Sequence, residues 1–326
     1  MAELVYRHWG DDLDPATTVC VDGLAPCRLQ LSHWPGNATP RELKHDLSTG
    51  ICLNLARSEN RSELLRGITT VSNTHWDTDG LCSVFATLEP GLAVVRADLL
   101  LAAALAGDMS VFTTPEGVKI DLTLTQLTKH PDSPVASERF EGERERRQAQ
   151  YDYALEMLPS LLANPDLHID WVASDYWTIQ RDLRALREDE AEVEVLDSLD
   201  LATIRADRAF HQTAVNTICD CDRILTLVEV DGGVLAELRL TTLSWFDLFS
   251  RPAGPRPGWG PLLEHLTSLT GGDKGSWIAD PLTDPTPTLR YVDDDGRPVA
   301  CGCHSSTIEE AVKAFYAGFP RLEAGF

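Results

Sequence analysis

The chain reads Val71-Ser72-Asn73-Thr74-His75-Trp76-Asp77-Thr78-Asp79-Gly80-Leu81-Cys82-Ser83 where an apolar strand pattern gives way to a helix pattern. In an extended chain, side chains two residues apart point to the same side. His75, Asp77 and Asp79 are therefore expected to converge on one point. One imidazole and two carboxylates suit Mn, Mg or Fe(II), so the stretch predicts a metal site at the end of a strand.

The same residues have a simpler interpretation as a capped turn. Asp, Asn and Gly are common in turns, and Asp79 is suited to be the N-cap of the following helix. A turn alone does not explain why His75 and Asp77 share a side with Asp79, so we favour the metal site. Gly80 is expected to let the backbone turn sharply there.

The first half of the chain alternates strand and helix patterns. Predicted strands are Arg28–Ser32 and Ile68–Asn73, and predicted helices are Pro40–Ala56 after a capping box at Thr39, a helix from Leu81, and Ala97–Ala106 ending at Gly107. This order predicts an α/β fold with a parallel, doubly wound sheet, whose functional groups lie at the carboxyl ends of the strands.

Further metal ligands are predicted at the same edge of this sheet. If the strands that end near His33 and His75 are parallel neighbours, one metal centre can collect both histidines. Asp46, on the predicted first helix, and Asp108, just after Gly107, are additional candidates. Their simpler interpretations are a solvated helix face and a turn residue.

The second half of the chain changes to strand patterns at about residue 191. Predicted strands are Val193–Leu196, Leu201–Ile204, Arg223–Val230, Val234–Leu243, Leu289–Val292 and Pro298–Ala300, and predicted helices are Gly260–Leu269 and Thr307–Ala317. We therefore expect two domains. Residues 1–190 form an α/β metal-binding domain with a helical extension, and residues 191–326 form a smaller α+β domain that orients the substrate.

The motif Asn73-x-His75-x-Asp77-x-Asp79-Gly80-x-x-Ser83 resembles the first motif of the DHH phosphoesterases. The resemblance covers residues 73–83 and implies that His75, Asp77 and Asp79 bind paired Mn or Mg ions that activate water for attack on phosphorus. The Asp-His-His triplet that names this family does not occur in the sequence. Together, Ser32-His33-Trp34-Pro35-Gly36 and the motif at His75 are also similar to an uncharacterised bacterial family that carries both.

The same resemblance implies a cleft between two domains, with the second domain gripping an anionic group of the substrate. His211, Asn216 and Arg223 are the predicted substrate-binding residues, with Arg251 as a further candidate. The planar guanidinium of Arg grips phosphate or carboxylate at two points. A lone His before a strand and an Arg that opens a strand also have ordinary structural interpretations.

Composition limits the classes of partner. The chain has 326 residues, 43% of them hydrophobic, and a formal net charge of -23. Such a charge repels a phosphate backbone, so we expect a small anionic substrate and no nucleic acid. No apolar run reaches the length of a membrane span, and the N-terminus lacks a signal segment, so we expect a cytoplasmic protein with no membrane partner, whose eight cysteines are mostly core thiols.

The favoured function is a metal-dependent, phosphoesterase-like hydrolase that uses Mn, or Mg or Fe(II), with His75, Asp77 and Asp79 as its catalytic group. One alternative is a non-haem Fe(II) enzyme, an oxygenase or a lyase, because two His and one carboxylate also form that ligand set. A second alternative is a metal-free binding protein in which the acidic loop is only a turn.

Overall fold

The computed structural model describes residues 4–188, 190–271 and 275–321, and the chain divides into two compact units. The first unit is Met1–Thr178 with Phe246–Ser250, and the second is Ile179–Trp245 with Arg251–Phe326. The division falls inside helix α8 (Ile169–Arg187), whereas the sequence pattern placed it at residue 190. Tyr176 of this helix contacts Phe112 in the first unit, and Asp182 accepts a hydrogen bond from the His211 backbone N–H in the second.

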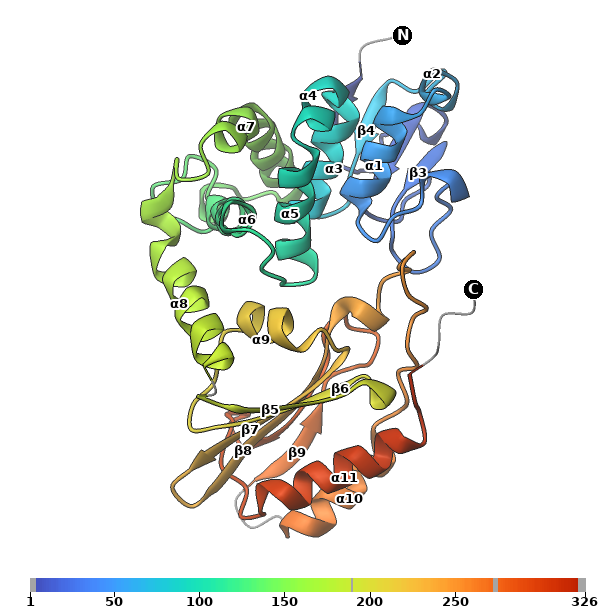
Figure 1. The fold of residues 1–326 in the computed structure, drawn as a ribbon. Helices are drawn as coiled ribbons and strands as arrows, with labels where there is room; N and C mark the ends of the chain where they lie inside the picture. Colours follow the sequence, from blue (N-terminus) through green and yellow to red (C-terminus); the bar gives the residue numbers. More distant parts are fainter. Residues whose placement is uncertain (1–3, 189, 272–274, 322–326) are drawn as a thin grey trace. The chain divides into compact units, whose positions relative to one another are not determined.

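The first unit contains a four-stranded sheet in which every pair is parallel (Figure 1). Its strands, in spatial order, are β1 (Val5–Tyr6), β4 (Thr70–Ser72), β2 (Thr18–Val21) and β3 (Leu29–Leu31). The strands are short, and β2 and β4 are buried along their whole length. Because the strands are parallel, their carboxyl ends meet at one edge of the sheet.

Helices make up most of the remaining first unit. They are α1 (Ser48–Arg57), α2 (Arg61–Leu64), α3 (Thr78–Leu88), α4 (Pro90–Val95), α5 (Ala97–Asp108), α6 (Pro115–Leu127), α7 (Glu143–Ala163) and the start of α8, with single 3-10 turns at Pro15–Thr17, Arg41–Leu43 and Ser137–Arg139. α3 packs against α1 and α5, and α5 packs against α6. α3 is apolar and buried almost throughout, which makes it the central helix of this core.

Two predicted helix boundaries are wrong. The expected helix Pro40–Ala56 is a 3-10 turn followed by extended residues, and α1 begins only at Ser48. Thr39 forms no capping box, because its hydroxyl donates to the Ser32 carbonyl oxygen at 2.7 Å. Gly107 does not end α5, whose last residue is Asp108.

The second unit contains a six-stranded, mostly antiparallel sheet. Its strands, in spatial order, are β5 (Glu192–Leu196), β6 (Leu201–Ala206), β7 (Arg223–Val230), β8 (Gly233–Leu240), β10 (Thr288–Val292) and β9 (Ser276–Ala279), and its helices are the end of α8, α9 (Gln212–Cys219), α10 (Gly260–Thr270) and α11 (Ser305–Ala317), with 3-10 turns at Asp197–Leu199 and Thr242–Ser244. Only the β6–β7 pair is parallel. The predicted strand Pro298–Ala300 is reduced to an isolated bridge between Pro298 and Val292, and β9 was not predicted.

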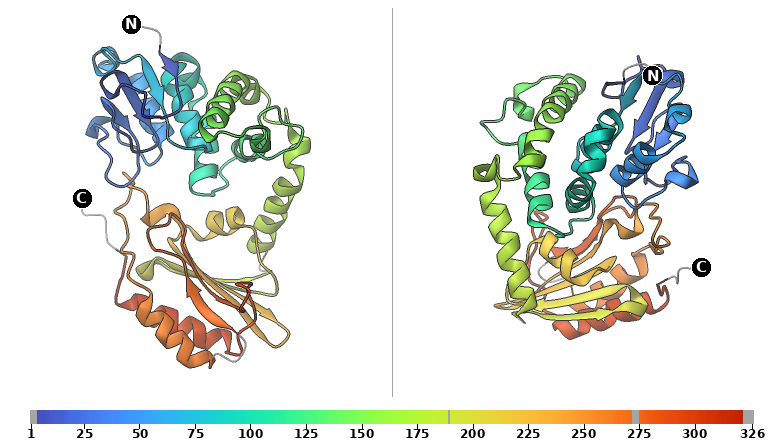
Figure 2. Two further views of the ribbon diagram at one scale, coloured as in Figure 1. Left: turned by 180° about the vertical axis from the view of Figure 1, so that it is seen from behind. Right: turned by 45° about the horizontal axis from the view of Figure 1, so that its top comes forward.

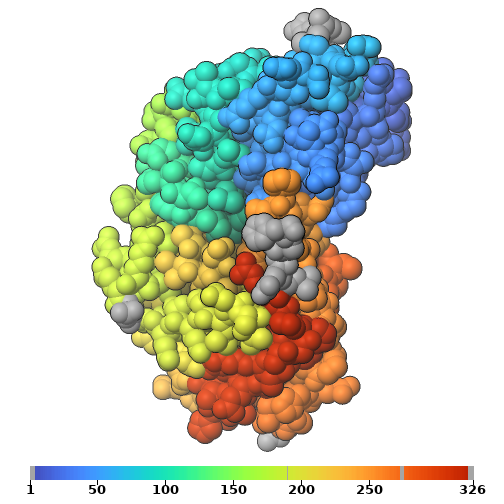
Figure 3. Space-filling view, turned by 45° about the vertical axis from the view of Figure 1, so that its right-hand side comes forward, coloured from blue at the N-terminus to red at the C-terminus, as the bar shows by residue number. Residues whose placement is uncertain are grey.

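Alternation along the strands gives this second sheet two different faces. Leu225, Leu238 and Leu289 share one core with Leu266 of α10 and Ile308 of α11, so these two helices cover one face. Figure 2 shows them side by side against the sheet, and Figure 3 shows them on the surface of the unit. The alternate residues of the same strands point to the other face, where α9 lies.

The two sheets confirm the predicted α/β fold class, with a parallel sheet first and an α+β region after it. No helix within the described ranges is both long enough and apolar enough to cross a membrane.

Candidate metal centre

Three of the four parallel strands of the first unit are followed by candidate metal ligands at one edge of the sheet. Asp22 comes directly after β2, His33 comes just after β3, and His75 lies on the loop after β4. The predicted adjacency of the strands that precede His33 and His75 is wrong, because β2 lies between them. The strand order therefore places Asp22 between the two histidines.

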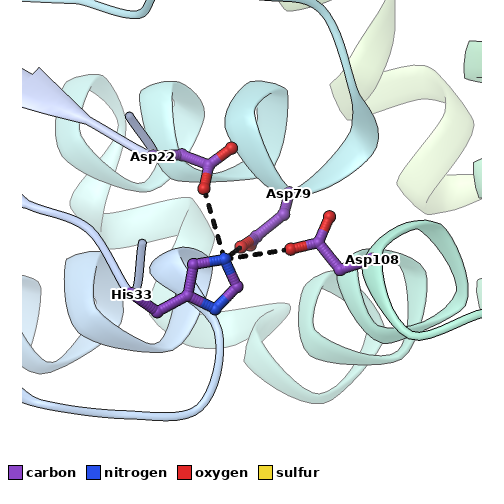
Figure 4. Close-up of side chains that lie close together, drawn as sticks. All are labelled: Asp22, His33, Asp79 and Asp108. Atoms are coloured by element: carbon purple, nitrogen blue, oxygen red, sulfur yellow. Dashed lines mark ion pairs between the residues drawn. The ribbon is translucent and has the colours of Figure 1, made fainter. Parts of the chain in front are cut away.

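The first ligand group consists of Asp22, His33, Asp79 and Asp108 (Figure 4). Nε2 of His33 lies 3.1 Å from Asp108 Oδ2, 3.5 Å from Asp22 Oδ1 and 3.7 Å from Asp79 Oδ2. No side chain of the four is more than 5% exposed. Three carboxylates and one imidazole thus converge from four separate segments in a closed space, and they could hold a cation.

The second ligand group consists of Asp22, His75 and Asp77. Nε2 of His75 lies 2.5 Å from Asp77 Oδ2 and 3.3 Å from Asp22 Oδ2. The His75 and Asp77 side chains are 27% and 33% exposed, so this group is open to solvent where the first group is closed.

Asp22 belongs to both groups through different oxygens, with Oδ1 toward His33 and Oδ2 toward His75. Its backbone is in the left-handed region at φ 44°, which is uncommon for a residue other than Gly. Asn73 Nδ2 donates to the Asp22 carbonyl oxygen at 3.2 Å, and the Ser48 hydroxyl donates to Asp22 Oδ1 at 2.8 Å. These contacts hold the shared carboxylate in place.

Asp22 was not among the predicted ligands, although the sequence around it contains a signal. The buried strand Thr18–Val21 ends in Asp22-Gly23, which is the same arrangement of an apolar strand followed by an acidic residue that identified the loop after β4. The predicted strand set began only at Arg28, so the carboxyl end of β2 was not considered.

His33 is held so that one ring nitrogen faces the carboxylates. Its Nδ1 lies 2.5 Å from the Asp46 carbonyl oxygen, which fits a tautomer with the proton on Nδ1 and the lone pair on Nε2. The imidazole also stacks on the Phe246 ring, with centroids 3.8 Å apart. Nε2 is buried and forms no hydrogen bond within the described part of the chain, as expected for a ligand atom.

His75, Asp77 and Asp79 each belong to one of the two ligand groups, but they do not converge on one point as predicted. β4 ends at Ser72, and α3 begins at Thr78 with Asp77 as its N-cap, so the chain is not an extended strand across this motif. His75 and Asp77 enter the second group, whereas Asp79 turns with the helix into the first.

Asp79 and Gly80 have further local roles. The Asp79 carboxylate accepts the backbone N–H groups of Ser48 and Thr49 at 2.8 and 2.7 Å, which ties the start of α1 to the start of α3. Gly80 lies within α3 and makes no sharp turn. Its hydrogen is required for space, since a Cβ there would lie 2.6 Å from Asn73 Nδ2 and 2.8 Å from Asp77 Oδ1.

The electrostatics of the two groups favour a cation. Burial and neighbouring carboxylates raise the pKa of Asp22 to about 6 and the pKa of Asp108 well above its usual range. Burial lowers the pKa of His75, but the carboxylates of Asp77 and Asp22 outweigh burial and raise it to about 11. Three carboxylates of the first group and two of the second face one imidazole each, so carboxylates outnumber histidines in both groups.

The other predicted ligand, Asp46, lies outside both groups. It precedes α1 in extended chain, where its backbone carbonyl positions His33 and its Oδ1 accepts the Ser250 backbone N–H at 2.7 Å. Its carboxylate is therefore engaged with the segment Phe246–Ser250, which also places Phe246 on His33.

The predicted substrate-binding residues lie in the second unit. The Arg223 guanidinium is buried, donates to the carbonyl oxygens of Leu199, Phe319 and Pro255, and stacks over Tyr316. His211 is the N-cap of α9. Asn216 accepts a hydrogen bond from Arg239 Nη2 at 3.0 Å.

Arg251, the further candidate, pairs with Asp200. The contacts of Arg223 and Arg251 are those of structural residues, since their cationic groups already have partners inside the unit.

Comparison with known proteins identifies a family and no activity. A model of a family of unknown function (DUF6687) matches residues 3–318, so the chain belongs to this family. The match agrees with the expected uncharacterised family and gives no support to the DHH resemblance. No curated protein matches the sequence.

Proposed function

We propose that the protein is a metal-dependent hydrolase with two adjacent cation sites that share Asp22. The observation that carries this proposal is the pair of ligand groups in which one carboxylate contributes a separate oxygen to each. Carboxylate oxygens with an imidazole suit Mn²⁺, and also Mg²⁺ or Fe²⁺. Adjacent two-metal sites of this kind are widespread among enzymes that hydrolyse phosphoesters.

The two groups suggest different roles. The closed group offers four protein ligands, and the solvent-exposed group offers three, so a cation in the second would keep more positions for water and substrate. Cations bound here would supply Lewis acidity, lowering the pKa of water and stabilising charge on the substrate. His75 and Asp77 would bind the exposed cation, and Asp22 would fix the spacing between the two.

The substrate that we favour is a small phosphoester or related anion. The motif at residues 73–83 resembles that of the DHH phosphoesterases, and it supplies ligands to both groups. Long nucleic acid is disfavoured, because a net charge of -23 opposes its approach.

The non-haem iron alternative requires two His and one carboxylate on one ion. His33 and His75 fall into different groups in the described part of the chain, and each is accompanied by two or more carboxylates. This division favours hydrolysis over the Fe(II) alternative. A metal-free binding protein would have to bury the carboxylates of the first group without a cation, which is costly.

A metal analysis combined with an activity panel tests the proposal. Protein purified without chelator is expected to contain Mn, Fe or Mg at about two ions per chain. It should turn over at least one member of a panel of small phosphoesters, nucleotides and pyrophosphate.

The Asp77→Ala variant should lose that turnover while it remains folded. The matched control is Asp98→Ala, since Asp98 is an exposed residue on α5. Protein without bound metal, or equal turnover by Asp77→Ala and the parent, would contradict the proposal. Turnover that depends on O₂ and Fe(II), with no hydrolysis in the panel, would favour the oxygenase alternative.

A further inference from the structure

The face of the second sheet that α10 and α11 leave uncovered contains a cavity of about 470 Å³. It lies over β6, β7, β8 and β10, and residues of α9 form part of its wall. Cavities of this size hold small organic ligands in other proteins. All its lining residues belong to the second unit, so it is separate from the candidate metal centre.

Arg239 on β8 is the notable polar residue of this cavity. The strand register places it between Ile224 of β7 and Thr288 of β10, in the middle of the sheet. Its side chain is only 8% exposed. Asn216 of α9 accepts a hydrogen bond from Nη2, whereas Nη1 is buried and has no hydrogen-bond partner among the residues described.

A buried guanidinium with an unused donor is costly, and proteins rarely leave one without a reason. In Arg223 of the same unit, both terminal nitrogens donate to carbonyl oxygens, and Nε is the nitrogen without a partner among the described residues. Burial lowers the pKa of Arg239, although the nearby Glu237 carboxylate opposes this. A carboxylate that entered the cavity would supply the acceptor that Nη1 lacks.

The other lining residues limit the kind of anion. Arg290 is already paired with Asp280 at 3.2 Å, and the negative charge of Glu237 offsets that of Arg239, so the formal charges at the cavity sum to about zero and cannot neutralise a dianion. Most of the remaining wall is apolar, from Ile204, Phe210, Val215, Val228 and Leu235. A doubly charged phosphate fits such a wall poorly, whereas a carboxylate attached to an apolar body fits it well.

We infer that this cavity is a binding site for a small organic carboxylate, with the Arg239 guanidinium as its ionic partner and Asn216 as the residue that orients that guanidinium. The site does not depend on the proposed hydrolase activity. It can therefore be tested in the full chain after metals have been removed.

The test measures binding of 2-naphthoate, its neutral isostere 2-naphthamide and inorganic phosphate to the EDTA-treated full-length protein by calorimetry. 2-Naphthoate is expected to bind at least about ten-fold more tightly than 2-naphthamide, the contribution of one hydrogen bond to a charged group. Arg239→Met should remove this preference. Arg297→Met is the matched control, because Arg297 is 77% exposed and lies outside the cavity lining.

Asn216→Asp provides a second variant that keeps the Arg239 side chain. An Asp at this position would neutralise the guanidinium from within, so the preference for 2-naphthoate should again disappear even if Arg239→Met does not fold. The inference is overturned if the parent binds 2-naphthoate and 2-naphthamide equally or binds neither, if both variants keep the preference, or if phosphate binds in place of the carboxylate. Because the metals and the EDTA are removed before the titrations, none of these results depends on the metal centre.

Discussion

The two units bury charge in opposite ways. In the second unit, Asp182 is buried but accepts hydrogen bonds from Arg208 Nη1 at 2.9 Å, Arg181 Nε at 3.1 Å and the His211 backbone N–H at 2.7 Å. In the first unit, the carboxylates of Asp22, Asp79 and Asp108 converge on Nε2 of His33. Asp182 thus has two arginines for one carboxylate, whereas the first ligand group has three carboxylates around one imidazole.

This difference separates a structural network from a candidate site. A buried ion pair with all its hydrogen bonds in place contributes to one unit of the fold and offers nothing to a ligand. Buried acidic groups that converge around a single imidazole raise one another's pKa and favour the binding of a cation. We therefore expect substitutions in the two networks to have different consequences, one for metal binding and the other for stability.

The largest effect is expected for Asp22→Asn. This change removes a charged ligand from both groups at once, while the amide keeps the shape of the side chain and an acceptor for Ser48. Loss of a residue that only supports a metal ligand lowers metal affinity by up to about 100-fold. Because Asp22 would contact the metals directly, metal affinity and metal-dependent turnover should fall by more than this. Metal titration and turnover measurements check this. Asp98→Asn on α5 should behave like the parent, and an Asp22→Asn protein with full metal content would contradict a shared ligand.

The converse change is Asp182→Asn in the second unit. Loss of this carboxylate leaves Arg208 and Arg181 without their buried partner, so the free energy of unfolding should fall by about 2–3 kcal/mol, less than for a fully buried pair because both arginines are partly exposed. Urea unfolding measures the loss, and metal content should not change. If Asp182→Asn lost metal and kept its stability, the Asp182 network would not be the structural network that we expect.

The fold was largely predictable because it depends on local patterns. Strands β5 to β8 appear as apolar or alternating runs, and the turn Asp231-Gly232-Gly233 identifies the hairpin between β7 and β8. Strand β2 was missed, although with four residues it is longer than β3 and β4, and its position in the middle of the sheet arises from pairing with distant segments. Strand order is a long-range property that the local pattern does not contain.

The site was predictable in its residue types and only partly in its geometry. His33, His75, Asp77, Asp79 and Asp108 all lie in the two ligand groups. The alternation argument assumed one extended strand, whereas Asp77 caps a helix and Asp79 lies inside it, so the ligands divide between two groups. Asp46 was expected to contribute its carboxylate and instead contributes its backbone carbonyl, a role that side-chain chemistry cannot indicate.

A pH experiment sharpens the contrast between the units. Burial raises the pKa of Asp121 in the first unit from 3.8 to about 6, although a hydrogen bond from Thr78 opposes this, whereas Asp182 in the second unit has a lowered pKa because its hydrogen bonds and arginines outweigh burial. An acid with a raised pKa binds protons more tightly when folded. Its contribution to stability is therefore complete below about pH 4 and is lost as the pH rises to 6.

Asp121→Asn removes this dependence without removing the acceptor for Thr78. In EDTA the variant should match the parent at pH 4 and exceed it above pH 6, by at most about 2–3 kcal/mol in the free energy of unfolding. Asp182→Asn should show no such gain above pH 6, since a lowered pKa adds stability there. Parallel pH profiles for the parent and Asp121→Asn in urea unfolding would argue against an unfavourably buried Asp121.

The smallest effect is expected at Phe246, which lies far from the ligands in sequence and yet stacks on His33. Phe246→Ala would remove the apolar cover from the closed group and leave the imidazole held by the Asp46 carbonyl alone. We expect affinity for the first cation to fall by about ten-fold, as for other outer-shell changes, with little effect on the ion in the open group. Calorimetric titration with Mn²⁺ is expected to resolve two sites of different affinity. Phe249→Ala is the matched control, because Phe249 lies in the same segment and is 67% exposed.

Phe246→Leu should recover most of the affinity, since an apolar side chain still excludes water from the carboxylates. If Phe246→Ala binds Mn²⁺ as tightly as the parent at both sites, the ring only fills space, and the closed group owes its affinity to the four ligands and the Asp46 carbonyl.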